Sequence, residues 1–337
     1  MTGPSGDQTG PSGEFGGPPL GSLFSITGRP APGLYAGAWL FTFLGTGFIA
    51  VALVASVSGN GAGAGWLAAV GFASFFLAAL LGSGYQTLVR RRTRDPQRYR
   101  GPSPFLVFAA IFAGANAIGA VVALSGIDAL LTAETRVLLS VAIVVPLYAL
   151  LVWVLVVREG ALDWRAMGWP TRPGTSARAL ADLAYGVATT VPIVLLTTLV
   201  ALVLVALFQV TPPALLPIPR TPAEWAVDIV VAVILAPVGE ELFFRGFAQT
   251  AWTRDLGWRA ALLRTAIFFA LVHAISTGGT DFSEGLRIAV VAIVARLPVA
   301  FGLGWVFART GSIVASIGLH AGFNGLMLVL AAFAVTR

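Results

Sequence analysis

The chain alternates between long apolar segments and short polar stretches. Nine apolar segments follow one another, and most approach the roughly 20 residues that an α-helix needs to cross a bilayer. The pattern predicts an all-α, polytopic membrane protein of about nine transmembrane helices. The seventh segment is short and Arg296-Leu297-Pro298 interrupts the eighth, so either can be irregular or buried among other helices. The segments lie near residues 34–57, 66–89, 104–125, 136–157, 183–208, 225–248, 259–275, 286–308 and 312–334.

Composition supports this class and removes several kinds of chemistry. Of the 337 residues, 57% are hydrophobic and 11% are charged, and the mean hydropathy is +0.86. The charged fraction is under half of the roughly 25% found in soluble domains. The absence of cysteine excludes disulfides, thiolate metal sites and a cysteine nucleophile. Every basic residue is arginine, so a lysine base or nucleophile is excluded as well.

The arginines predict the orientation in the membrane. With the N-terminus inside, 15 of the 21 basic residues fall in inner loops and 4 fall outside, while Arg245 and Arg296 lie within spans. The positive-inside rule then favours a protein with its N-terminus inside and its C-terminus outside. The expected location is the plasma membrane. The net charge of +6 therefore reflects topology. No nucleic-acid partner is expected.

The composition also divides the chain along its length. Residues 1–33 are rich in Gly, Pro and Ser, which predicts a disordered cytoplasmic tail. Residues 34–160 form an N-terminal transmembrane extension of about four helices with few polar side chains. Residues 180–334 contain the polar groups that are candidates for chemistry.

Three ionisable residues cluster at the end of the sixth segment. Glu240, Glu241 and Arg245 lie within six positions, and charged groups at membrane depth are rare unless they are paired or functional. On a helix, Glu241 and Arg245 are i,i+4 neighbours, so they can form an ion pair. Glu240 points roughly 100° away from Glu241 and has no partner in its own segment. We therefore expect Arg245 to neutralise Glu241 and leave Glu240 available for chemistry.

The two histidines of the chain both lie in late apolar segments. His273 follows Phe269 by one helical turn, and His320 precedes Asn324 by one turn. Counted from a turn near residues 255–257, Glu240 and His273 lie at a similar depth, each about 24 Å along its helix. His320 would be roughly 10 Å shallower if the helices were parallel, a gap that helix tilt can close.

These groups suit hydrolysis of a peptide bond by an activated water. Glu240 with His273 can hold and deprotonate a water molecule. His320 and Asn324 can donate hydrogen bonds to the oxyanion of the tetrahedral intermediate. Two histidines and a glutamate can also ligate zinc. We favour a mechanism with no metal, since no HExxH or thiolate set is present.

The same residues resemble the motifs of the CAAX prenyl endopeptidase and bacteriocin-processing (CPBP) family of intramembrane proteases. Glu240-Glu241-x-x-x-Arg245, Phe269-x-x-x-His273 and His320-x-x-x-Asn324 occur in the order of the family's three motifs. The resemblance covers about residues 180–334. It implies a helical membrane fold, a bundle with a buried polar cavity. It also implies that Glu240 and His273 activate water, that His320 and Asn324 form the oxyanion site, and that Glu241, Arg245 and Phe269 support them.

The expected function is therefore that of a glutamic intramembrane endopeptidase. Its expected partners are the lipid bilayer and a membrane-embedded or lipidated peptide substrate, without a cofactor. A zinc-dependent version of the same protease is one alternative. A second is an ion-coupled transporter or a scaffold, because intramembrane carboxylates and histidines also build proton relays. That alternative favours repeats in both halves of a chain, whereas the polar groups here lie in one half.

Overall fold

The first half of the chain folds into four helices. The computed structural model describes residues 25–170, 176–210, 219–275 and 277–335, and these residues form helices without any strand. The helices α1 (Pro32–Val57), α2 (Gly61–Thr93), α3 (Pro104–Leu124) and α4 (Ala133–Val152) come first, with the short η2 (Ile127–Leu130) before α4 and η3 (Trp153–Val157) after it. The all-α prediction is confirmed. Residues 1–24 of the expected tail lie outside the described residues.

The second half supplies five further helical segments. The helices α5 (Ser176–Ala188) and α6 (Thr190–Phe208) form one bent segment. Residues 222–256 form the next segment, here called the glutamate helix. It consists of α7 (Pro222–Asp228), η4 (Ile229–Leu235), α8 (Ala236–Glu241), η5 (Leu242–Gln249) and α9 (Thr250–Leu256). The chain then continues through α10 (Trp258–Ala274), α11 (Phe282–Thr310) and α12 (Ile313–Val335).

The number of helical segments agrees with the sequence pattern. Seven helices in the described chain are long and apolar enough to cross a membrane. The glutamate helix, with its charged residues, and α10, with 17 residues, are the other two. The possible break in the eighth segment is not present, because α11 continues through Pro298 without interruption. Membrane helices tolerate an internal proline where neighbouring helices compensate for the lost hydrogen bond.

Tight turns set the antiparallel order of the helices that carry the polar residues. Gly257 has φ +80 and Gly311 has φ +65, backbone conformations that glycine adopts without a steric penalty. Gly257 separates α9 from α10, and Gly311 separates α11 from α12. Both turns lie where the sequence predicts them.

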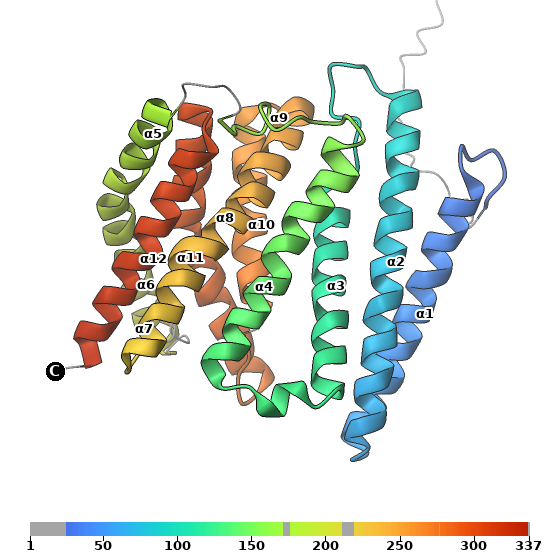
Figure 1. Cartoon of the computed structure of the whole chain (residues 1–337), viewed down its shortest axis with the longest axis horizontal. Helices are drawn as coiled ribbons and strands as arrows, with labels where there is room; N and C mark the ends of the chain where they lie inside the picture. Colours follow the sequence, from blue (N-terminus) through green and yellow to red (C-terminus); the bar gives the residue numbers. More distant parts are fainter. Residues whose placement is uncertain (1–24, 171–175, 211–218, 276, 336–337) are drawn as a thin grey trace, which may run out of the picture.

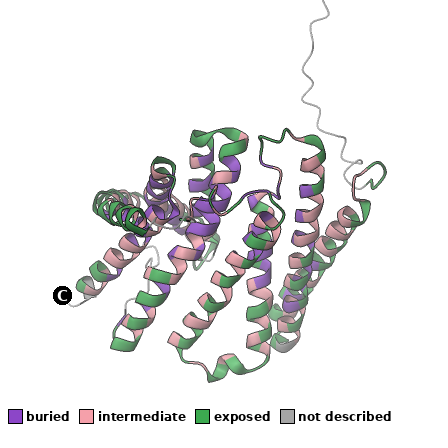
Figure 2. Ribbon diagram, turned by 45° about the horizontal axis from the view of Figure 1, so that its top comes forward, coloured by how far each residue is buried: buried purple, intermediate pink, exposed green. Residues whose placement is uncertain are grey.

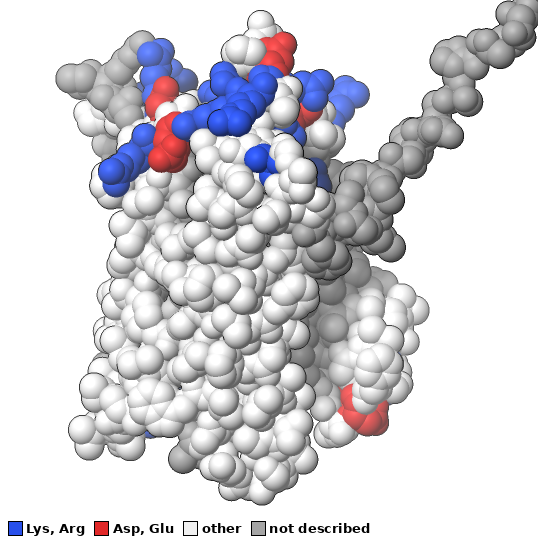
Figure 3. All heavy atoms as spheres, turned by 90° about the vertical axis from the view of Figure 1, so that its right-hand side faces the viewer, with Lys and Arg blue, Asp and Glu red and all other residues white. Residues whose placement is uncertain are grey.

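The helices run up and down, so that α1 begins at one end of the bundle and α12 finishes at the other (Figure 1). On the face that Figure 3 shows, arginine side chains gather at one end above a body almost free of charge. This is the distribution that the positive-inside rule uses. The described chain is that of an integral membrane protein.

The first half packs directly on the glutamate helix. Phe108 of α3 lies 5.8 Å from Phe243 and 5.2 Å from Phe268, measured between ring centroids. Tyr148 of α4 lies 5.4 Å from Phe243. The buried residues concentrate in these central helices (Figure 2), and only 11% of the apolar window of α1 is buried. The helices α3 and α4 therefore share the core with the glutamate helix, while α1 lies at the edge of the bundle.

A polar contact fixes the arginine-rich end of the glutamate helix. Arg94 forms an ion pair of 2.6 Å with Asp255, and the backbone amide of Tyr99 donates to the same carboxylate over 3.2 Å. Burial raises the pKa of the Tyr99 phenol, which packs in the core beside Phe247. The loop after α2 thus holds the end of α9 in place.

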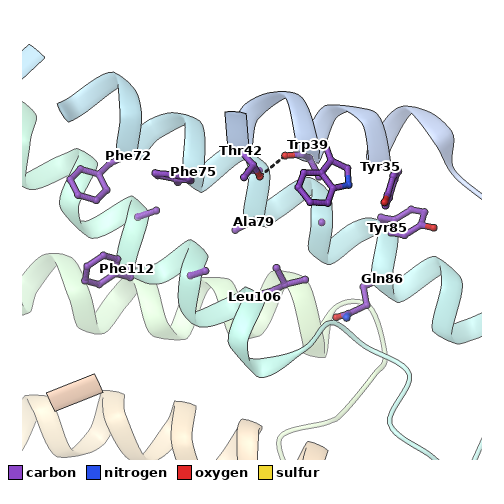
Figure 4. A pocket seen from close by; sticks show the side chains of 15 residues that line it. Tyr35, Trp39, Thr42, Phe72, Phe75, Ala79, Tyr85, Gln86, Leu106 and Phe112 are labelled. Carbon is purple, nitrogen blue, oxygen red and sulfur yellow. Dashed lines mark hydrogen bonds between the residues drawn. The ribbon is translucent and has the colours of Figure 1, made fainter. Parts of the chain in front are cut away.

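A large apolar pocket lies away from the polar residues, between α1, α2 and α3 (Figure 4). Its volume is about 630 Å³. Tyr35 and Trp39 enter it from α1, Phe72 from α2 and Phe112 from α3. Its lining contains no carboxylate, histidine or arginine, so it holds none of the groups that hydrolysis requires.

Candidate active site

The glutamate helix departs from regular α-helix on both sides of Glu240. Both η4 and η5 are π-helical, a geometry that is rare and frequently marks functional sites. In the first stretch, the carbonyl of Ala232 would accept a hydrogen bond from position 237, but Pro237 has no amide hydrogen. The side-chain amide of Asn324 supplies the missing donor over 2.7 Å. Pro237 thus explains why Asn324 turns toward this helix.

A cavity of about 270 Å³ encloses the polar residues. The glutamate helix, α6, α10, α11 and α12 all contribute to its wall. The glutamate Glu240 and the histidines His273 and His320 lie on it, together with Phe269 and Asn324. The lining is completed by Thr197, Val231, Ala232, Ala236, Arg296, Val299, Phe323 and Met327.

Glu241 and Arg245 form a fully buried ion pair. Nη1 of Arg245 lies 2.9 Å from Oε1 of Glu241, and both side chains are 0% exposed. Nη2 of Arg245 donates to the carbonyl of Ala300 over 3.1 Å. One turn further along, the amide of Gln249 donates to the carbonyl of Gly304 over 2.8 Å. The pair is thus present as the i,i+4 spacing predicts, and it also attaches α11 to the glutamate helix.

His320 lies between the two adjacent glutamates. Its Nδ1 is 2.8 Å from Oε1 of Glu241, and its Nε2 is 3.9 Å from Oε2 of Glu240. Because a carboxylate without a proton only accepts hydrogen bonds, we assign the proton of the neutral ring to Nδ1. The neutral ring then presents the lone pair of Nε2 to the cavity. Glu241 therefore positions His320 as well as pairing with Arg245.

His273 approaches Glu240 from α10. Its Nδ1 lies 2.8 Å from the carbonyl oxygen of Phe269, so the same reasoning assigns a proton to Nδ1. Its Nε2 lies 3.5 Å from Oε2 of Glu240. The Phe269 ring packs 4.2 Å from the His273 ring, and the guanidinium of Arg245 lies 4.6 Å from the Phe269 centroid. Phe269 therefore fixes the orientation of His273 through its carbonyl and its ring.

The structure brings together all seven residues that the sequence motifs single out. Glu240 and His273 meet at the similar depth that residue counting predicts. The expected offset of His320 is closed, because its ring reaches both glutamates. Small residues beside His320 also let α12 pack closely against α5. A Cβ atom on Gly318 would lie 2.5 Å from the carbonyl oxygen of Leu183 in α5.

Two polar residues of the cavity are not in the motifs. Arg296 of α11 and Thr197 of α6 both line it. The sequence offered a signal for Arg296, which is the second arginine within a span, but it stood out only as an interruption of the segment. Thr197 carries no distinguishing signal, because threonine is common in membrane helices. Within the described ranges, no group of three or more His, Cys, Asp or Glu side chains is arranged to hold a metal ion.

Comparison with known proteins agrees with this geometry. Residues 222–326 match the family described as type II CAAX prenyl endopeptidase Rce1-like. The match contains the glutamate helix, α10, α11 and the part of α12 that carries His320 and Asn324. Comparisons with curated proteins and with solved structures gave no match. Residues 222–326 are therefore similar to the Rce1-like CAAX endopeptidases of the CPBP family, a family of intramembrane proteases.

Proposed function

We propose that the protein is a glutamic endopeptidase that hydrolyses a peptide bond of a membrane-embedded or lipidated protein without a metal ion. One observation carries the proposal. Both histidines have Nδ1 bound to an acceptor, so Nε2 of each neutral ring faces the same carboxylate oxygen of Glu240. The Nε2 lone pairs and the Glu240 oxygen are all hydrogen-bond acceptors, so they need a donor between them. A water molecule, which donates two hydrogens, can fill this role.

The reaction begins with a water between Glu240 and His273. Glu240 takes a proton as the water oxygen attacks the scissile carbonyl carbon, which becomes a tetrahedral oxyanion. The C–N bond then breaks, and the proton on Glu240 passes to the leaving amine. The products are a new carboxyl terminus and a new amino terminus. His273 orients the water through Nε2.

Asn324 and His320 stabilise the oxyanion. One hydrogen of the Asn324 amide is bound by Ala232, and the second is left for the substrate. His320 can donate to the oxyanion through Nε2 when its ring carries a proton there as well as on Nδ1, which faces Glu241. Glu241 and Arg245 thus act by positioning and charge, while Glu240 is the base.

The protein would act in the plasma membrane with its N-terminus and its arginine-rich end on the cytoplasmic side. The distribution of the 21 arginines supports this orientation. The experiment that tests the function compares membrane proteomes of cells carrying wild type, Glu240→Ala and Arg245→Ala, with Glu159→Ala as a control at an exposed glutamate. New peptide termini are expected with wild type and the control only. Identical termini in all four strains would contradict the proposal and favour a transporter or a scaffold instead.

A further inference from the structure

We infer that Arg296 and Thr197 form a subsite that binds a carboxylate of the substrate peptide. The inference rests on the proposed peptidase function and names two residues that determine its specificity. Arg296 lies midway along α11, with about 20 Å of helix on either side. At that position its charge cannot reach the membrane surface, so a local reason for an arginine is needed.

Arg296 lacks an acidic partner in the described part of the chain. Its only hydrogen bond there runs from Nη1 to the carbonyl of Ala292 in its own helix, over 3.0 Å, and it forms no ion pair with a described carboxylate. Arg245 differs, because it is matched by Glu241. A guanidinium has five N–H donors, so most of those on Arg296 remain for a ligand in the cavity.

The register between helices places Arg296 near the reacting groups. Arg245 and Gln249 bind the carbonyls of Ala300 and Gly304, so successive turns of the glutamate helix pair with successive turns of α11. One turn earlier, the same register sets Glu241 against Arg296. The hydrogen bond to Ala292 draws the guanidinium toward the start of α11, away from the level of Glu241, by up to one helical turn, about 5 Å. About two residues of extended peptide span that distance.

Thr197 adds a second polar group at the same level. A Cβ atom on Gly302 of α11 would lie 2.8 Å from the side chain of Ile193 in α6. The helices α6 and α11 run in opposite directions (Figure 1). The turn of α6 after Ile193, which carries Thr197, therefore faces the turn of α11 before Gly302, which carries Arg296. Thr197 is 3% exposed, and its hydroxyl is buried without a hydrogen-bond partner. Arg296 can thus pair with a carboxylate while Thr197 donates to it.

Two sources of carboxylate fit this chemistry, the C-terminal carboxylate of the substrate and an acidic side chain beyond the scissile bond. These two sources are distinguished by measuring how peptides bind to the full chain in lipid nanodiscs. The chain carries Glu240→Gln, which prevents turnover. The probes are three fluorescent tetrapeptides of Ala, Val and Leu. One has a free C-terminal carboxylate, the second a carboxamide, and the third a carboxamide with Glu as its last residue.

The free carboxylate is expected to bind about 10- to 100-fold more tightly than the carboxamide, the range for a hydrogen bond to a charged group. Arg296→Gln should remove this preference and leave binding of the carboxamide unchanged. Arg296→Lys should keep part of it. Arg309→Gln is the matched control, because Arg309 is exposed at the end of the same helix. Tight binding of the third peptide would identify a side-chain carboxylate as sufficient.

Equal binding of acid and amide peptides would overturn the inference, as would equal loss of all three peptides in Arg296→Gln. Thr197→Val conserves side-chain shape and provides a second test if Arg296→Gln does not fold. It should weaken the acid peptides alone, by about 3- to 10-fold. The subsite is read from binding and the function from cleavage, so they fail separately. Cleavage without carboxylate preference rejects the subsite, and preference without cleavage rejects the peptidase.

Discussion

The Nδ1 atom of His320 lies 2.8 Å from Oε1 of Glu241, the same oxygen that pairs with Arg245. One buried carboxylate oxygen therefore binds side chains from two helices, the His320 ring of α12 and the Arg245 guanidinium of the glutamate helix. This arrangement separates the roles of two consecutive glutamates. Glu241 has no access to the reacting atoms, being 0% exposed, whereas Glu240 opens into the cavity with a side chain 21% exposed.

The first prediction concerns the buried pair. Arg245→Leu leaves a buried carboxylate without its strongest partner, and breaking a buried pair costs about 3–5 kcal/mol of stability. Thermal unfolding of the purified protein should show a large fall in Tm. Arg91→Leu, at an exposed ion pair with Glu159, should cost no more than about 1 kcal/mol. A Tm for Arg245→Leu equal to that of Arg91→Leu would contradict a structural role for the pair.

The second prediction concerns the histidine rings. Because their Nδ1 atoms face a carboxylate and a carbonyl, both rings should carry a proton on Nδ1. The chain has only two histidines, so ring-¹⁵N labelling gives a spectrum with few signals. Glu241→Ala should change the His320 signals and leave those of His273 in place. A ring protonated at Nε2 alone would exclude the assigned arrangement.

The third prediction concerns Asn324. Asn324→Ala removes a proposed donor to the oxyanion, and loss of one such donor lowers kcat by about 10²- to 10³-fold. It also leaves the carbonyl of Ala232 without its partner, which should destabilise the protein by about 1 kcal/mol. Asn116→Ala is the control, because its amide bonds only within its own helix. Unchanged kcat in Asn324→Ala would assign the residue to packing alone.

The fourth prediction concerns metal dependence. Cleavage by the purified protein should be unchanged after treatment with a zinc chelator and dialysis, because in the proposed mechanism Glu240 and His273 activate the water without a metal ion. The measurement compares initial rates before chelation, after chelation and after added Zn²⁺. Loss of activity that Zn²⁺ restores would favour the zinc-dependent alternative.

Much of the fold and of the site followed from the sequence because polar residues are scarce in it. Glu240, His273 and His320 stand out against apolar neighbours, and the i,i+4 spacing within one helix identifies the partner of Glu241. The contact between Glu241 and His320 joins separate helices and depends on their tilt, so spacing alone does not reveal it. The turn of Asn324 toward Ala232 follows from a π-helical stretch around Pro237, and sequence patterns for regular helices do not encode such a local change.

Arg296 illustrates a different limit. Its apolar surroundings and the nearby Pro298 indicated a possible break in the helix, whereas α11 is continuous and directs the side chain into the cavity. The pairing of turns between α11 and the glutamate helix places Arg296 near the polar residues of the cavity. That pairing is a property of packing, and it emerges only when the helices are placed together.

The most direct test of the central claim is the single-turnover rate of a membrane peptide that wild-type cells cleave, measured with purified full-length protein in nanodiscs. Glu240→Gln retains the shape of the side chain and removes the base, so the rate should fall by at least about 10²-fold. Folding, monitored by Tm, should be retained, and Glu159→Gln should cleave at the wild-type rate. Cleavage by Glu240→Gln at the wild-type rate would show that this glutamate is not the base.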